Sequence, residues 1–196
     1  MEVTLKQIKE LREKTGVGIN ACKEALVESS GNIDKAVDLL RKQGIAKSTK
    51  RADKVASDGT IGVYVHANDK IAAMVELNCE TDFSARSESF KEAAHDLAMQ
   101  VAAMDPRYVD INSVPTEIIE KEKNIYRESL VKEGKPENIV EKIIEGKLAK
   151  FYKENCLMEQ NFIKDDSIII RDYLNQIIAK IGEKIEIGKM YRISVG

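Results

Sequence analysis

The segment of this sequence that comes nearest to a known catalytic motif is GEKIEIGK at residues 182–189. A glycine-rich loop of this kind can cradle nucleotide phosphates with its backbone N–H groups. The fit fails, because five residues rather than four separate the glycines and Met190 stands where Ser or Thr must hold magnesium. The loop would also follow a helix and precede a strand, which reverses the order that phosphate loops use.

The other side chains that could do catalysis or bind a metal are dispersed along the chain. The two histidines, His66 and His95, adjoin no cluster of cysteines, which argues against a structural zinc site. The three cysteines (Cys22, Cys79 and Cys156) form no CxxC pair, and their odd number indicates reduced thiols rather than a disulfide framework. We therefore expect no metal, no cofactor and a cytoplasmic location.

The charge and hydropathy of the chain favour a binding protein rather than an enzyme. Carboxylates are abundant, but almost all fall on charged faces of predicted helices, and none forms a recognisable acid/base pair. The 31 basic and 33 acidic residues give a net charge of -2, without the basic excess typical of a nucleic-acid-binding protein. No stretch approaches the roughly 18 apolar residues of a membrane span, and the N-terminus resembles no signal or transit peptide. An enzyme with an unrecognised site is an alternative for which the sequence offers no convergent polar pocket.

Residues 1–44 predict a head of three short helices. A T-x-x-Q capping box at Thr4 starts the first helix, and Asn20 and Asn32 are placed to cap the second and third. Gly44 is expected to end the third helix. The apolar residues that recur at helical spacing are Leu5, Ile8, Leu11, Cys22, Ala25, Leu26, Ile33, Ala36, Val37 and Leu40.

Residues 45–58 predict a linker in which charges of both signs are mixed. Its charged residues include Lys47, Lys50, Arg51 and Lys54, against Asp53 and Asp58. A run of this kind is usually a solvated surface. The functional alternative is a basic strap near an acidic partner.

Residues 59–196 predict an α+β domain. Strands are expected at residues 61–66 and 71–79, followed by a helix at 87–103. A helical hairpin follows at about 116–153. Its arms carry one apolar stripe each and are charged elsewhere, as suits an antiparallel pair of helices that protrudes into water.

The arms of the hairpin are expected at residues 116–133 and 137–153. A loop at 156–166, a helix at 167–181 and a final strand at 185–195 complete the chain. The predicted fold class is therefore α+β. It combines a helical head, a linker, and a core of about three antiparallel strands covered by helices, from which the hairpin protrudes.

Two motifs in this sequence resemble the elongation factor Ts family. LREKTGVG at residues 11–18, CKEAL at 22–26 and GNIDKA at 31–36 are similar to the ubiquitin-associated-like helical head of that family. VELNCETDF at residues 75–83 is similar to the family's signature at the end of a core strand. Head and signature together are very specific, and the resemblance covers essentially the whole chain. It matches the short members, which carry the strand-and-helix core once.

The resemblance implies a guanine-nucleotide exchange factor for the translational GTPase elongation factor Tu, bound in its GDP-loaded and nucleotide-free forms. Short members pair two chains to restore a doubled core, which implies a homodimer and a two-plus-two complex. No contact with nucleic acid or a membrane is implied. The alternative is an adaptor whose ubiquitin-associated-like module binds an unrelated protein, but an adaptor would not need the Thr81-Asp82-Phe83 signature.

The resemblance also implies a wedge on the magnesium and phosphate side of the GTPase, formed by Thr81, Asp82 and Phe83 with Ile181 and Gly182 beside them. Phe83 would insert between two helices of the partner. From the pattern alone, Phe83 could instead pack in its own core, and Asp82 could simply cap the next turn or helix. Ile181 and Gly182 could be only the last core residue and the C-cap of a helix.

A second contact is implied for the head, where Lys9, Arg12 and Ile19 match positions that bind near the guanine-base side. Ile19 and Asn20 stand where the family often has two methionines that touch the partner. His66 would touch a more distant domain of the GTPase. Lys9 and Arg12 could instead be solvated, and His66 could be an ordinary surface residue.

Overall fold

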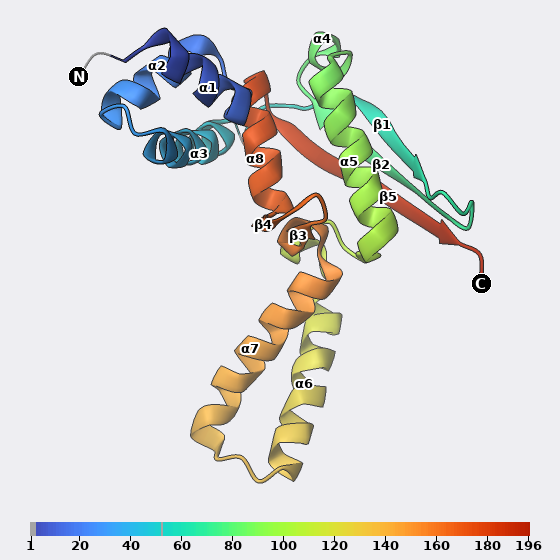
Figure 1. Cartoon of the computed structure of the whole chain (residues 1–196). Helices are drawn as coiled ribbons and strands as arrows, with labels where there is room; N and C mark the ends of the chain where they lie inside the picture. The colour runs from blue at the N-terminus through green and yellow to red at the C-terminus, as the bar shows by residue number, and fades with distance from the viewer. Residues whose placement is uncertain (1–2, 52) are drawn as a thin grey trace.

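The centre of the molecule is a three-stranded antiparallel sheet, seen in a computed structural model that describes residues 3–51 and 53–196 (Figure 1). Strands β1 (Asp58–Val65), β2 (Ile71–Cys79) and β5 (Ile185–Ser194) lie in the order β1-β2-β5. A short turn joins β1 to β2, whereas β5 reaches the sheet from the end of the chain. The predicted α+β class, with three antiparallel strands and helices around them, is confirmed.

One face of this sheet is covered by α5 (Glu88–Met104), and α8 (Ile170–Ile181) packs beside it (Figure 1). Helix α5 approaches β1 very closely at Gly62. A Cβ atom added to Gly62 would lie 2.0 Å from the carbonyl oxygen of Ala94, so no side chain fits there. The fully buried side chains between sheet and helices include Val75, Leu77, Cys79, Phe90, Leu97 and Ile170.

The opposite face of the sheet is apolar and exposed. The register pairs Val63 with Met74 and Met74 with Tyr191, so these side chains form a row across the three strands. Side chains alternate between the two faces along each strand, except at a bulge opposite Val75 and Leu77, where β5 carries one extra residue. We call the exposed face the open face, and its large exposed apolar residues are Ile61, Val63, Val65, Met74, Tyr191 and Ile193.

The head consists of α1 (Leu5–Thr15), α2 (Ile19–Glu28) and α3 (Ile33–Lys50), as the sequence predicts. The capping box at Thr4 is confirmed, with both of its reciprocal hydrogen bonds present. Asn32 also caps as expected, since its side-chain oxygen accepts the backbone N–H three residues further on at 3.0 Å. The head has its own buried cluster, made of Ile8, Leu11, Val17, Cys22, Ala25, Leu26, Ala36 and Leu40.

Two helix boundaries that the sequence predicts in the head are wrong. The second helix begins at Ile19, because Gly18 already has the extended backbone of an N-cap, with φ -59° and ψ 150°. Asn20 therefore lies inside the first turn and does not cap the helix. The third helix does not end at Gly44 but continues to Lys50, into the segment predicted to be a linker.

Gly44 is buried where α3 crosses α8, which explains why a glycine stands inside a helix. A Cβ atom added there would lie 3.1 Å from the backbone oxygen of Asn175 and 3.2 Å from the Cβ of Ala179. The missing side chain allows the two helices to approach. An ion pair between Arg41 and Asp172 joins the same helices. The head is thus attached to the core by α3 and not only by a linker.

The predicted hairpin is formed by α6 (Thr116–Lys132) and α7 (Glu137–Asn155), and it projects away from the core (Figure 1). Gly134 turns the chain between the arms with a φ of 71°, a value that glycine adopts easily. The arms bury a small cluster of their own, made of Leu130, Val140, Ile144 and Leu148. None of the helices in the described residues is long and apolar enough to cross a membrane.

The segment after the hairpin contains structure that the sequence did not predict. The expected loop at 156–166 contains a short 3-10 helix (Leu157–Glu159) and the strand β3 (Asn161–Phe162), which pairs with β4 (Asp165–Ile169). The following helix begins at Ile170 and not at Ser167. Ser167 is held in the strand because its backbone N–H and its hydroxyl both donate to Asp165, at 3.1 and 2.6 Å.

We predict that Gly62→Ala destabilises the protein by about 1–3 kcal/mol, as overpacking of a core does, because the added methyl group meets the backbone of α5. Gly146→Ala is the control, since a Cβ atom at this position in α7 meets nothing within 4 Å. That change should stabilise the protein by up to about 1 kcal/mol through helix propensity. Denaturant unfolding measures both values. Equal stabilities of the two variants would contradict the close contact between α5 and β1.

Candidate functional site

An exposed aromatic ring stands on a tight turn at the end of β2. The short helix α4 (Asp82–Ala85) follows this strand, with Thr81 as its N-cap (Figure 1). The hydroxyl oxygen of Thr81 accepts the backbone N–H of Ser84 at 3.3 Å. Phe83 is 84% exposed, whereas Ala85 in the same helix is buried. The turn is therefore anchored in the core while its ring points to solvent.

The exposure of Phe83 excludes the alternative that this ring packs in its own core. Phe90, seven residues later, is fully buried, so the chain buries one ring and presents the other. The alternative role of Asp82 as a cap is also excluded, because Thr81 caps the helix. The carboxylate of Asp82 pairs with Arg86 at 3.0 Å in an exposed ion pair, and such pairs contribute little to stability.

A carboxylate from near the end of the chain binds the turn that carries Phe83. The Oε2 atom of Glu183 accepts the backbone N–H groups of Glu80 and Thr81, each at 3.1 Å. Its Oε1 atom accepts the hydroxyl of Thr81 at 2.7 Å. Burial acts to raise the pKa of Glu183, but the hydrogen bonds from Ser84 and Thr81 outweigh it and lower the pKa below its ordinary value. The charged form is therefore favoured.

Glu80 makes the reciprocal contacts. Its Oε1 atom accepts the backbone N–H of Lys184 at 2.6 Å and the guanidinium of Arg51 at 2.7 Å. The hydrogen bond from Lys184, followed by that from Arg51, lowers the pKa of Glu80. Each glutamate thus binds the backbone beside the other. We call Glu80 and Glu183 the carboxylate clamp, which ties the turn after β2 to the turn after α8.

The carboxylate clamp brings together two groups of residues that the sequence predicts to share a site. Gly182 is the C-cap of α8, with a φ of 84°, and Glu183 follows it directly. Ile181 is the last residue of that helix and packs against the core. Both residues therefore hold the structural positions that the pattern alone allowed. Their expected contact with a partner, beside Phe83, stays a prediction.

Sequence reasoning missed the clamp residues and Arg51, because charged residues in turns are indistinguishable from ordinary solvated surface. The donors to Glu183 are two backbone N–H groups and a hydroxyl, and they lie up to 103 residues away in the sequence. Two signals were available. Glu80 lies inside the signature at residues 75–83, and Glu183 directly follows Gly182.

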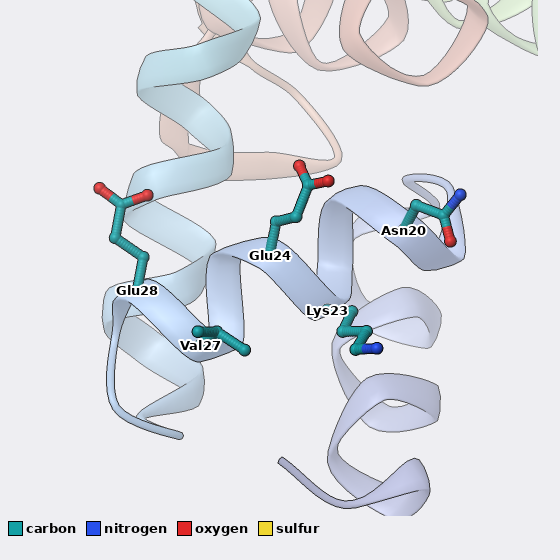
Figure 2. A pocket seen from close by; sticks show the side chains of 5 residues that line it. All are labelled: Asn20, Lys23, Glu24, Val27 and Glu28. Atoms are coloured by element: carbon teal, nitrogen blue, oxygen red, sulfur yellow. The ribbon is translucent and has the colours of Figure 1, made fainter. Parts of the chain in front are cut away.

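The head residues that the sequence assigns to partner binding lie on the surface. Lys9 and Arg12 are exposed one turn apart on α1, and Ile19 at the start of α2 is 53% exposed. Asn20 borders a hollow along α2 that Val27, whose side chain is exposed, also lines about two turns further along the helix (Figure 2). These positions offer cationic and apolar groups to a protein partner, and their contact with one stays a prediction.

His66 lies at the end of the sheet opposite to Phe83. It follows β1, and its Nδ1 atom is 3.2 Å from the hydroxyl of Tyr64. The 9 residues of β2 separate the two ends, which corresponds to about 30 Å at the usual rise of a strand. The structure therefore does not bring His66 to the turn of Phe83.

Within residues 3–51 and 53–196, no group of three or more His, Cys, Asp or Glu side chains is placed to hold a metal ion. The thiols of Cys22, Cys79 and Cys156 are free and buried. Burial raises the pKa of Cys79, and it raises the pKa of Cys156 to about 11. These two thiols are therefore protonated near neutral pH and are poor nucleophiles.

Comparison with known proteins was consistent from one end of the chain to the other. The sequence model of a family described as Elongation factor TS matches residues 3–196. Elongation factor Ts of Nitratidesulfovibrio vulgaris is 52% identical over 196 residues, which cover 100% of this chain and 98% of that protein. Elongation factor Ts of Thermosipho melanesiensis is 53% identical over 194 residues, 99% of each chain. That of Fervidobacterium nodosum is 50% identical over the full length of both chains.

We predict that Phe83→Ala changes the free energy of unfolding by less than about 0.5 kcal/mol, as surface substitutions usually do. The matched control is Phe90→Ala, which removes a fully buried ring and should cost about 3–5 kcal/mol. Urea unfolding followed by circular dichroism compares the two variants. A loss of several kcal/mol on truncation of Phe83 would mean that this ring supports the fold.

Proposed function

This chain belongs to the elongation factor Ts family, and we propose that it is the guanine-nucleotide exchange factor of elongation factor Tu. Membership of the family gives it a role in translation elongation. In the proposal it binds Tu in the GDP-loaded and nucleotide-free forms, and it speeds the release of GDP. It acts in the cytoplasm, needs no cofactor and makes no direct contact with nucleic acid or a membrane.

The observation that carries the proposal is the exposure of Phe83 on a hydrogen-bonded turn. A large apolar ring that is 84% exposed costs free energy in water and gains it when a partner buries it. Aromatic residues that enter a pocket of the partner are typical hot spots of protein interfaces. Asp82 beside the ring adds a negative charge, and Thr81 holds the backbone of the turn.

In the proposed mechanism, Phe83 inserts between two helices on the magnesium and phosphate side of Tu. Insertion displaces the groups that support the ion and the phosphate-binding loop. The magnesium ion is the main positive charge beside the diphosphate, so its loss leaves the diphosphate poorly neutralised. GDP then dissociates faster. Ile181 and Gly182 of this chain contact the surface of Tu beside the inserted ring.

Energetics set a strict condition on this mechanism. The factor must bind nucleotide-free Tu more tightly than GDP-loaded Tu, because equal affinity would shift no equilibrium. By linkage, the factor then weakens GDP binding by the same ratio that GDP weakens binding of the factor. Each tenfold ratio corresponds to about 1.4 kcal/mol of coupling. A contact that is equally strong with GDP-loaded and nucleotide-free Tu adds affinity but does not speed the release of GDP.

The head supplies contacts of that second kind in the proposal. Lys9, Arg12, Ile19 and Asn20 dock on a helix of Tu near the guanine-base side, and His66 touches a more distant domain. These contacts hold the factor on Tu while Phe83 acts elsewhere. The separation of about 30 Å across the sheet, estimated from the rise of a strand, lets His66 and Phe83 reach different domains of one GTPase.

An adaptor function for the head would explain the exposed residues of α1 and α2 equally well. It would leave Phe83 without a role, and it would not account for the match of the family model to residues 3–196. The exchange factor is a regulatory binding protein in this proposal, and it catalyses no chemical reaction on a substrate of its own.

We predict that Phe83→Ala lowers the maximal rate of GDP release from Tu by at least about tenfold, since truncation of a hot-spot aromatic commonly costs about 2 kcal/mol. Stopped-flow release of fluorescent GDP measures this rate. Ile163→Ala is the control, because this apolar residue is 39% exposed at the turn between β3 and β4, outside the proposed interface. Normal release with Phe83→Ala, or no acceleration by the unaltered protein, would refute the wedge.

We also propose that the open face pairs two copies of this chain. Isolated exposed apolar residues are common, but a contiguous apolar patch usually marks an interface. The row formed by Val63, Met74 and Tyr191 is continuous across all three strands. Two such faces can stack about 10 Å apart as a sandwich, which gives two sheets with one helical cover each. The complex with Tu would then contain two copies of each protein.

We predict that Met74→Glu converts the dimer into a monomer, because it buries a charge at the centre of the stacked sheets. Val131→Glu is the control, since this residue is 65% exposed on the helical hairpin. Sedimentation velocity at micromolar concentration distinguishes the two states. A monomeric unaltered protein at that concentration would count against pairing through the open face.

A further inference from the structure

Nothing in its own packing fixes the ring of Phe83. It is 84% exposed, and it stands on a helix of only 4 residues. So short a helix has little stability of its own, since nucleating a helical turn is unfavourable. The position of the ring in the free protein is therefore set by whatever holds the backbone of the turn.

The carboxylate clamp is what holds that backbone from the solvent side. Glu183 accepts two successive backbone N–H groups and one hydroxyl, at distances of 2.7 to 3.1 Å. Glu80 returns the contact by accepting the N–H of Lys184 at 2.6 Å. Two turns that are remote in the sequence are thereby joined by four hydrogen bonds to carboxylate oxygens. Hydrogen bonds to an ionised acceptor are shorter and stronger than neutral ones.

Arg51 extends the clamp toward the head. Its guanidinium lies 2.7 Å from the same Glu80 oxygen, and it follows the end of α3 directly. A second link runs from the side chain of Lys184 to the backbone oxygen of Lys54, at 2.9 Å. The segment that joins the head to the sheet is therefore attached to the turn that carries Phe83.

We infer that Glu183 is a positioning residue for nucleotide exchange, which acts with Glu80 by holding the Phe83 turn in the orientation that enters the partner. This inference rests on the proposed exchange function. A binding contact would raise affinity alone. A positioning contact leaves the affinity for Tu to the contacts of the head. It raises the rate at which GDP leaves, because Phe83 would lose most of its effect if it were misplaced.

Two substitutions of Glu183 distinguish loss of its hydrogen bonds from loss of its charge. Glu183→Ala removes every hydrogen bond that this carboxylate accepts. Glu183→Gln keeps them in a neutral form, because the amide oxygen can accept both N–H groups and the amide nitrogen can donate to the hydroxyl oxygen of Thr81. The matched control is Asp110→Ala, since Asp110 also accepts a backbone N–H and a hydroxyl, both from Ser113, in the turn before the helical hairpin.

The experiment measures the rate of fluorescent GDP release from Tu over a range of factor concentrations. It separates the maximal rate from the half-saturating concentration. With Glu183→Ala we expect the maximal rate to fall roughly tenfold, about the effect of one charge-assisted hydrogen bond. The half-saturating concentration should change less than about threefold, by the same conversion. Glu183→Gln should restore most of the rate, and Asp110→Ala should behave as the unaltered protein.

Amide hydrogen exchange on the free protein supplies an independent readout. Glu183→Ala should speed exchange at the N–H groups of Glu80 and Thr81, while Glu183→Gln should leave them protected. If Glu183→Ala fails to fold, Glu80→Ala tests the other half of the clamp with the same kinetic expectations, and it should speed exchange at the N–H of Lys184.

Three results would overturn the inference. One is a maximal rate with Glu183→Ala that equals that of the unaltered protein. Another is a change confined to the half-saturating concentration, which would make Glu183 a simple binding residue. The third is equal failure of Glu183→Gln and Glu183→Ala when both are folded. If the unaltered protein fails to accelerate GDP release, the proposed exchange function is wrong. If the unaltered protein accelerates release and Glu183→Ala does so equally well, only the proposed role of the carboxylate clamp is wrong.

Discussion

The structure depends on keeping one aromatic ring out of the core without letting its turn become loose. Burial would be the easy outcome for Phe83, because hydrophobic collapse favours it. The fold prevents burial by fixing both sides of the turn. Ala85 and Cys79 are buried on the core side, and Glu183 accepts the backbone N–H groups on the solvent side. With the turn fixed on both sides, the side chain of Phe83 points to solvent.

The same constraint accounts for features that are distant from Phe83. Strand β2 must be rigid to carry the turn, and it is the central strand of the sheet, paired on both sides. Gly62 lets α5 lie directly on β1, the neighbour of β2 in the sheet. Helix α8 ends at Gly182, which places Glu183 at the turn.

Attachment of the head follows a related rule. A flexible linker would let the head and the core bind a partner independently. Here α3 continues past Gly44 and packs on α8, and Arg51 bonds to Glu80. Surfaces of the head and of the core are thereby held in a defined relation. Two contacts on a rigid body lose less entropy on binding than two contacts on a flexible chain.

Several features followed from the sequence alone because they arise from local patterns. Helical spacing, the capping residues Thr4 and Asn32, and the apolar runs that form β1 and β2 depend on neighbours a few residues apart. The motif around Phe83 likewise indicated the family and an exposed role for the ring. Those predictions agree with the structure wherever it tests them.

Tertiary structure decided the rest, since the deciding partner lies far away in the chain. Gly44 has the local signature of a helix end, but α8 makes it a crossing point of two helices. Glu80 lies in the signature and Glu183 follows Gly182, but neither position indicates what the carboxylate bonds to. They become a clamp only when folding brings each carboxylate to the backbone beside the other, across 103 residues of sequence. The sequence alone does not show which donors a carboxylate will meet.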